Sequence, residues 1–127
     1  MMRIGITGEN LPKAKSKISQ GVRVGDLIFL SGQTGVDPIT GKIPEGIKEQ
    51  TRQAFVNIKN ILEAAGSSLD KIIYATVYLP DMNDWPAYNE VWGEVFADVQ
   101  PYPARSTVQV AGLLGGIKIE IQVVATI

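Results

Sequence analysis

The sequence has 127 residues, of which 45% are hydrophobic and 20% charged, and its formal net charge is −1. This size and composition predict one domain with a single core, covering residues 1–127. The balanced charge argues against nucleic-acid binding, because proteins of that class usually carry a basic surplus that matches the phosphates. No apolar run approaches the roughly 20 residues that cross a membrane, so no membrane partner is expected.

The sequence contains neither cysteine nor histidine. A thiol nucleophile, a Ser–His–Asp triad and a metal site built on Cys or His are therefore excluded, and no metal is expected. Acid–base chemistry is left to Glu, Asp, Lys or Tyr, to backbone groups or to bound water. The missing disulfide framework, with an N-terminus that lacks the apolar segment of a signal peptide, predicts a cytoplasmic location.

The first third of the chain has the pattern of strands and loops. Residues 3–6 are compatible with a short strand, and residues 20–31 predict a hairpin that turns at Gly25-Asp26. The segment Ser31-Gly32-Gln33-Thr34-Gly35 follows. Its two glycines would let a ligand approach the backbone closely, but a plain strand end explains them equally well.

Two amphipathic helices are expected further on. The first covers residues 47–65, and Gly66 stands where a left-handed C-terminal cap is expected. The second begins after Asp84, a residue type that often serves as an N-cap. Its apolar face should be core, although Asn89 and Trp92 could also border a pocket. The residues of that face are Trp85, Tyr88, Val91, Trp92, Val95 and Phe96.

Three further strands are predicted, over residues 69–79, 104–110 and 117–127. The odd-numbered residues of the last strand are apolar and should pack under the helices, because neighbouring residues of a strand point to opposite faces. Two helices can cover only one face of a sheet of about six strands. The fold class is therefore α+β, with both helices on one side.

Arg105 and Glu120 would lie on one polar face if the last two strands pair as an antiparallel hairpin. The arginine could then grip a small carboxylate ligand, and the glutamate could handle water or a proton nearby. The alternative is that both are solvated surface charges, or that they merely pair with each other. Strand spacing alone leaves both interpretations open.

The segments Pro103-Ala104-Arg105-Ser106-Thr107-Val108 and Ile119-Glu120-Ile121 resemble the signature of the RidA/YjgF family, also known as the L-PSP endoribonuclease family. The resemblance covers essentially the whole chain and includes Leu30-Ser31-Gly32-Gln33 and Asn89. It implies a chorismate-mutase-like fold with a mixed sheet. It also implies a homotrimer, in which the sheets pack together and three clefts form between subunits.

The resemblance further implies hydrolytic deamination of reactive 2-enamine and 2-imine acids, such as 2-aminoacrylate, to 2-keto acids and ammonia, without a cofactor. In such a protein Arg105 would bind the substrate carboxylate, and Glu120 would assist water or proton transfer. Backbone groups at Gly32 and around Thr107 would orient the ligand. The other residues that the resemblance implies at the pocket are Ser31, Asn89 and Ile18.

Two positions depart from the family pattern: Thr107 stands where many members have cysteine, and Ile18 where many have tyrosine. Non-catalytic binding of small carboxylates such as 2-keto acids therefore stays open as an alternative. A second alternative is an endoribonuclease, against which the net negative charge and the missing histidines count. Tyr74, Tyr78 and Trp92 could stack on bases, but core packing is expected for them.

Overall fold

The computed structural model describes residues 2–127, in which two helices pack on one six-stranded sheet. The strand order is β1-β2-β3-β6-β4-β5. The β4–β5 pair is parallel and the other pairs are antiparallel, so the sheet is mixed, as predicted. The elements are β1 (Ile4–Gly5), β2 (Gly21–Val24), β3 (Leu27–Leu30), α1 (Ile47–Ala64), η1 (Leu69–Lys71), β4 (Ile72–Leu79), η2 (Met82–Asp84), α2 (Trp85–Val95), β5 (Ala104–Gln109) and β6 (Glu120–Thr126).

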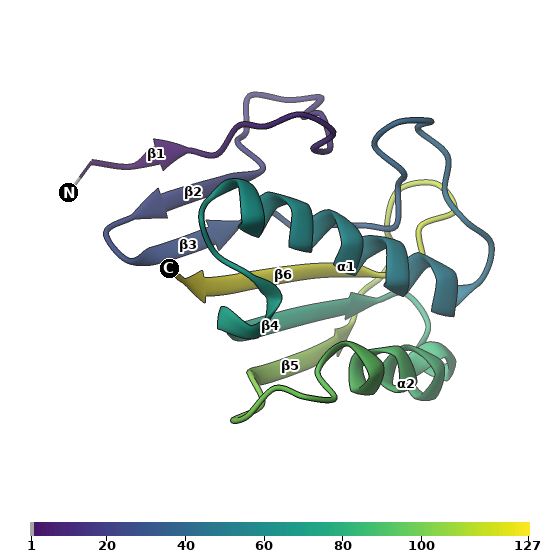
Figure 1. Ribbon diagram of the computed structural model, residues 1–127. Coiled ribbons are helices and arrows are strands. Elements are labelled where there is room, and N and C mark those ends of the chain that lie inside the picture. Colours follow the sequence, from purple (N-terminus) through teal and green to yellow (C-terminus); the bar gives the residue numbers. More distant parts are fainter. Residues whose placement is uncertain (1) are drawn as a thin grey trace.

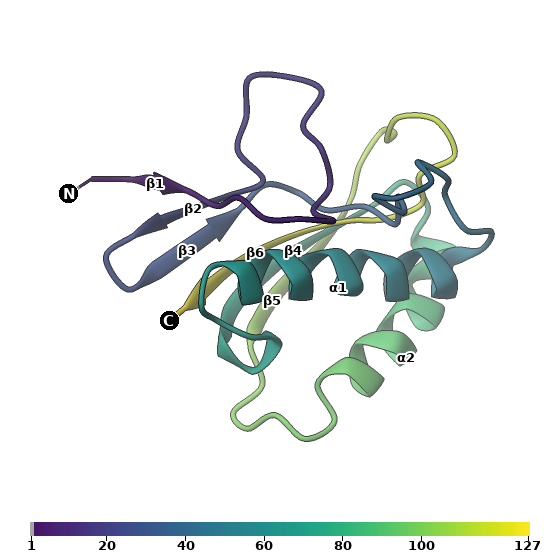
Figure 2. The same cartoon turned by 45° about the horizontal axis from the view of Figure 1, so that its top comes forward.

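Both helices lie on the same face of the sheet (Figure 1), and the turned view shows that the other face has no helix over it (Figure 2). The α+β prediction is therefore confirmed. The core lies between the helices and the sheet, and its β6 part follows the predicted alternation. The buried residues of this last segment are Ile119, Ile121, Val123 and Ala125. None of the helices within residues 2–127 is long and apolar enough to cross a membrane.

The last two strands do not form the expected hairpin. β5 lies at the edge of the sheet and pairs in parallel with β4, whereas β6 pairs with β4 on its other side. Residues 110–119 carry the chain past the end of β4 from one side to the other (Figure 1). The prediction was wrong because alternation along a strand fixes its faces but leaves its neighbours undetermined.

Both helices begin where the sequence pattern predicted, α1 at Ile47 and α2 at Trp85. α1 ends at Ala64, and Gly66 has the left-handed φ of 83° that was predicted. The predicted capping role of Asp84 was wrong. Asp84 makes no side-chain cap, because it already has helical dihedrals at the end of the turn η2. Asp81 does the capping instead, and its carboxylate accepts a hydrogen bond of 2.9 Å from the Asn83 amide.

Two tyrosines of β4 depart from the expected core packing. Tyr74 is 37% exposed, and Tyr78 is half-buried. Both point away from the helices, since their neighbours Ala75 and Val77 are fully buried on the helix side. The Tyr74 hydroxyl lies 2.7 Å from Ser106 Oγ, and this hydrogen bond lowers the pKa of Tyr74.

Two buried amides of α1 hold the loops at one end of the sheet. Gln50 donates to the Gly116 carbonyl at 3.1 Å and accepts from the Lys118 amide at 2.8 Å. Asn57 donates to the carbonyls of Thr34 and Val36 at 3.0 and 2.8 Å. These contacts fix the loops that follow Gly32 and precede Glu120, and so they position both residues.

Candidate functional site

Arg105 points to the helix side of β5, where it meets α2. It pairs in register with Ala75, which is buried under the helices. Its Nη1 donates a hydrogen bond of 2.9 Å to Asn89 Oδ1. A guanidinium carries five N–H donors, and this is the one side-chain hydrogen bond that Arg105 makes within residues 2–127. Most of its donors therefore stay available to a ligand.

Three aromatic rings of α2 surround the guanidinium. The ring centroids of Trp92, Tyr88 and Trp85 lie 4.6, 5.3 and 5.8 Å from Arg105 Cζ. Attraction between a cation and an aromatic face is strongest where water is excluded. A pocket of about 370 Å³ opens beside Arg105, between the C-terminal half of α2 and the segment before β5. Its other lining residues are Trp92, Gly93, Phe96, Tyr102 and Pro103.

Thr107 follows Arg105 by two positions and points to the same side of β5. Its hydroxyl lies 2.6 Å from the hydroxyl of Tyr88, which is fully buried. Burial raises the pKa of Tyr88 above its ordinary value, outweighing the opposite effects of Thr107 and the Arg105 charge. We call these six residues the Arg105 cluster: Trp85, Tyr88, Asn89, Trp92, Arg105 and Thr107.

Glu120 begins β6 and lies against Gly32. The two segments are joined by reciprocal backbone hydrogen bonds of 2.8 Å between Gln33 and Ile121. A methyl group added at Gly32 would stand 2.7 Å from Glu120 Cδ and 2.9 Å from its Cγ. The Glu120 side chain thus occupies the space that a side chain at position 32 would need. The sequence left open a ligand's close approach or a plain strand end for this glycine; within the chain, the group that lies against it is the Glu120 side chain.

Ser31 directly precedes this glycine, and Ile18 lies in the loop that Ser31 contacts. The Ser31 hydroxyl donates to the Ser19 carbonyl at 2.7 Å, which ties the loop containing Ile18 to the end of β3. The Ile18 side chain is 55% exposed and brings no polar group. We call Ile18, Ser31, Gly32 and Glu120 the Glu120 cluster.

The two clusters lie on opposite faces of the sheet within one chain. Glu120 is in register with Tyr78, which points away from the helices, whereas Arg105 is in register with Ala75, which points toward them. The prediction that both charges share one face is therefore wrong for a single chain. The alternative that they pair with each other is also wrong, because the salt bridges of residues 2–127 join Lys48 to Glu90 and Arg52 to Glu49 and Glu94.

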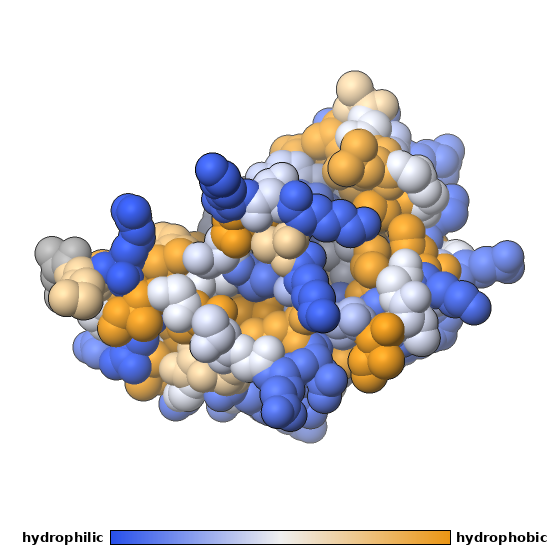
Figure 3. All heavy atoms as spheres, turned by 90° about the horizontal axis from the view of Figure 1, so that it is seen from above, coloured by the Kyte–Doolittle hydropathy of each residue, from blue (hydrophilic) through white to orange (hydrophobic). Residues whose placement is uncertain are grey.

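The sheet face that carries Glu120 also exposes apolar residues. Phe29 is 46% exposed and Val108 is 42% exposed, although both belong to strands. Hydrophobic atoms also reach the surface elsewhere, in patches between hydrophilic side chains (Figure 3).

The structure adds three partners of Arg105, for which the sequence pattern predicted only a place in the core or at a pocket border. Tyr88 and Trp92 belong to the core as predicted, whereas Trp85 is 37% exposed and was wrongly assigned to it. All three rings lie next to the Arg105 guanidinium. Helical spacing alone could not reveal this, because the arginine belongs to a strand distant in sequence. Within residues 2–127 no group of His, Cys, Asp or Glu has the arrangement of a metal site.

Comparisons with known proteins add four findings. The family model described as Endoribonuclease L-PSP matches residues 8–127. A RutC family protein of Pyrococcus horikoshii is 47% identical over 125 residues, 98% of each chain. A 2-iminobutanoate/2-iminopropanoate deaminase of Salmonella typhimurium is 40% identical over 121 residues, 94% of each chain. The crystal structure of Escherichia coli TdcF with bound serine superposes with a TM-score of 0.92 at 41% identity, covering 98% of each chain.

Proposed function

Because the chain belongs to the RidA/YjgF family, known also as the L-PSP or RutC family, we propose that it hydrolyses reactive 2-imino and 2-enamino acids to 2-keto acids and ammonia. The observation that carries this proposal is the preorganised guanidinium of Arg105, which keeps most of its donors free beside a pocket. Substrates of this class carry a carboxylate, and so does the serine bound to the TdcF relative. A guanidinium matches a carboxylate with two parallel hydrogen bonds.

In the proposed reaction Arg105 binds the carboxylate, and Glu120 orients water and moves protons. Protonation of an enamine at its terminal carbon gives an iminium. Water adds to the carbon that bears nitrogen, loses a proton, and the C–N bond then breaks to release ammonia and the keto acid. Positioning and proton transfer are sufficient for this hydrolysis, so the lack of histidine and cysteine is no obstacle.

We propose that the complete cleft forms between two chains of a homotrimer. Arg105 and Glu120 lie on opposite faces of one sheet, so one copy alone cannot direct both toward the same small ligand. The exposed apolar residues on the Glu120 face support burial against a neighbouring copy. In that arrangement the Arg105 cluster of one chain faces the Glu120 cluster of the next.

A coupled assay tests the activity. The purified protein is added to a threonine dehydratase that releases the reactive enamine, and ammonia or 2-oxobutanoate is followed with time. The wild type should speed product release, and Arg105→Ala should abolish the acceleration while keeping the fold. A wild type that gives no acceleration with serine- or threonine-derived substrates would rule out the proposed activity for them.

A complementation experiment tests the shared cleft. Arg105→Ala and Glu120→Ala chains are unfolded together and refolded as a mixture, with each variant refolded alone as the control. If the cleft takes Arg105 from one chain and Glu120 from another, mixed oligomers contain intact clefts and regain part of the wild-type rate. If both residues came from the same chain, mixing would restore nothing.

Non-catalytic binding of small carboxylates is the second candidate. The observation that favours it is the separation of the two clusters, because the Arg105 cluster could hold a 2-keto acid without any contribution from Glu120. Calorimetry with 2-oxobutanoate, next to turnover by Glu120→Ala, separates the two functions. A pure binder keeps its affinity in this variant and shows no turnover in the wild type.

A further inference from the structure

Two hydroxyl groups meet beneath Arg105 in an arrangement that the proposed roles of Arg105 and Glu120 leave unexplained. Tyr88 comes from α2 and Thr107 from β5, and their oxygens lie 2.6 Å apart. The Tyr88 side chain is fully buried, and its ring centroid lies 5.3 Å from the Arg105 guanidinium carbon. A hydrogen bond that links a buried helix residue to the strand of the binding arginine is well placed to act on a ligand there.

The direction of this hydrogen bond follows from the surroundings. Within residues 2–127 the Tyr88 hydroxyl has Thr107 Oγ1 as its one hydrogen-bond partner. If Tyr88 accepted, its own hydrogen would be left buried without an acceptor, which is costly. A phenol is also the stronger acid of the two hydroxyls. Burial raises the pKa of Tyr88, so the phenol keeps its proton at neutral pH. Tyr88 therefore donates, and Thr107 accepts.

This direction leaves the hydrogen of Thr107 free. A threonine hydroxyl has one donor and two acceptor lone pairs, and Tyr88 uses one lone pair. Thr107 is half-buried rather than sealed in the core, and it shares the face of β5 with Arg105. Side chains two positions apart on one strand are near neighbours. The free hydrogen is thus available to an anion that Arg105 holds.

We propose that Thr107, oriented by Tyr88, donates a hydrogen bond to the ligand that Arg105 binds, and that the pair sets the affinity for 2-oxo and 2-imino carboxylates. Tyr88 is a positioning residue, because it acts through Thr107. This inference rests on the proposed function for the class of ligand. It goes beyond that function by giving the threonine side chain a role and by assigning a purpose to a buried tyrosine. It also supplies a hydroxyl to a site in which Ile18 brings none.

The test uses 2-oxobutanoate as an unreactive probe, measured by calorimetry on the purified protein, with turnover measured in parallel. Tyr88→Phe and Thr107→Val should each weaken binding by about 2- to 10-fold, the range expected for one neutral hydrogen bond. Thr107→Ser keeps the hydroxyl and should bind like the wild type. The turnover number should change less than the affinity, since Glu120 is untouched.

The double variant Tyr88→Phe/Thr107→Val separates positioning from stability. Thr107→Val leaves the buried Tyr88 hydroxyl without a partner, and Tyr88→Phe removes the hydrogen bond to Thr107. Each single variant should therefore lower the melting temperature. Replacing both partners by apolar groups is nearly neutral for stability, so the double variant should melt closer to the wild type. Its affinity for 2-oxobutanoate should nevertheless be as low as that of Thr107→Val. Once the threonine hydroxyl is gone, the loss of Tyr88 as its positioning residue has no further effect on the ligand.

The outcomes distinguish this inference from the proposed function. Unchanged affinity in Tyr88→Phe, in a wild type that turns over substrate, overturns the inference alone. Wild-type binding that depends on Tyr88, without any acceleration of ammonia release, supports the inference and overturns the catalytic activity. Affinity losses in the two single variants that add up in the double variant mean that Tyr88 does not act through Thr107. A wild type that does not bind 2-oxobutanoate overturns the inference, and the coupled assay decides the catalytic activity separately.

Discussion

The Arg105 and Glu120 clusters are built in opposite ways. The Arg105 cluster is crowded: three aromatic rings, an amide and two hydroxyls from a helix and an edge strand surround one guanidinium. The Glu120 cluster depends on an empty position, because its carboxylate fills the space that a side chain at Gly32 would take. One charge is positioned by its neighbours and the other by a missing side chain.

This difference indicates what each cluster is suited to do. A guanidinium held by rings and hydrogen bonds loses little side-chain entropy when an anion arrives, which favours binding. A carboxylate can accept and return a proton, which suits the Glu120 cluster to the chemical step. We therefore expect changes in the Arg105 cluster to act mainly on affinity, and changes in the Glu120 cluster to act mainly on the rate.

The largest effect is expected for Glu120→Gln. The amide keeps the shape of the side chain but cannot accept a proton as a carboxylate does. Loss of a general acid–base group typically lowers the turnover number by roughly 10²- to 10⁴-fold. Steady-state kinetics with an imine substrate should show this fall with little change in KM. A large rise in KM at unchanged turnover number would instead mean that Glu120 acts in substrate binding. The two clusters would then not have different roles.

Gly32→Ala should be next in size. The new methyl would stand 2.7 Å from Glu120 Cδ, so the carboxylate must move. Displacing a catalytic group by about 1 Å can cost up to roughly 100-fold in rate. Gly112→Ala is the matched control, because a methyl group there meets nothing within 4 Å. Equal rates for the two variants would show that the position of the carboxylate does not matter.

Alternation in the sequence predicted the buried face of β6, but it predicted neither the face on which Arg105 lies nor the order of the strands. Alternation in the last strand identified the buried side of β6, and the helical pattern located α1 and its cap at Gly66. The crossing of residues 110–119 from β5 to β6 has no periodic signal, so the expected hairpin was wrong. The separation of Arg105 from Glu120 is a matter of register: Arg105 pairs with Ala75 on the helix side, and Glu120 pairs with Tyr78 on the other side.

Contacts between distant segments were equally invisible in the sequence. The tyrosine–threonine pair at Tyr88 and Thr107 joins a helix to a strand, and each residue has an ordinary explanation when taken alone. Gly32 was recognised as a place where the backbone could be approached closely. That the approaching group is the side chain of Glu120 depends on the bridge between Gln33 and Ile121, which only the fold provides.

Arg105→Lys tests the Arg105 cluster and should act on ligand affinity. Lysine keeps the charge but loses the planar fork and the stacking on Trp92 and Tyr88. Losing one charge-assisted hydrogen bond should raise KM by roughly 10- to 100-fold. Calorimetry with 2-oxobutanoate should show the same loss of affinity, while the turnover number at saturating substrate changes much less. If the turnover number falls as far as in Glu120→Gln, the arginine takes part in the chemical step.

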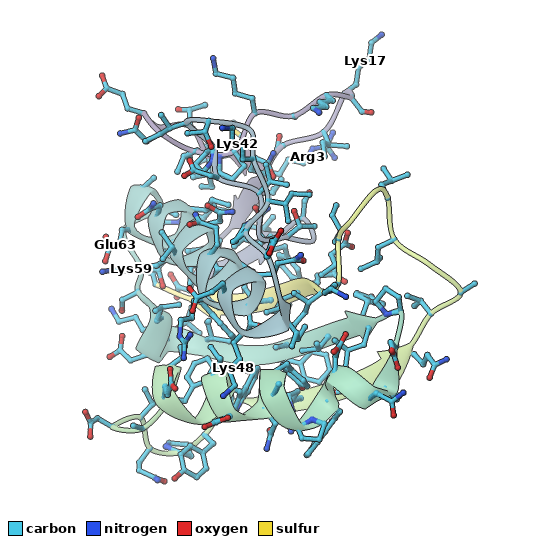
Figure 4. The ribbon with its side chains drawn as sticks, turned by 90° about the vertical axis from the view of Figure 1, so that its right-hand side faces the viewer. Arg3, Lys17, Lys42, Lys48, Lys59 and Glu63 are labelled. Atoms are coloured by element: carbon cyan, nitrogen blue, oxygen red, sulfur yellow. The ribbon has the colours of Figure 1, made fainter. Side chains whose placement is uncertain are left out.

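The smallest effect is expected at the junction of the two helices, where α1 supports the helix that carries the Arg105 cluster. Lys48 is labelled in Figure 4. Its Nζ lies 2.7 Å from Glu90 Oε2, and this contact lowers the pKa of Glu90. A folded-state pKa below the unfolded value gives stability that is present above the unfolded pKa and is lost as the pH falls through the folded pKa. Because both groups are exposed and screened by salt, the contribution is small.

Glu90→Gln should therefore lower the melting temperature slightly at neutral pH and low salt, with the difference vanishing below the pKa of Glu90 and at high salt. Thermal unfolding at several pH values measures this directly, and Glu45→Gln, which removes an exposed glutamate outside the helices, serves as the control. If loosening this junction affects function at all, it should weaken 2-oxobutanoate binding and leave the Glu120-dependent step unchanged. A selective loss of turnover number would mean that a change between the two helices alters the step that depends on Glu120. The two clusters would then not act independently.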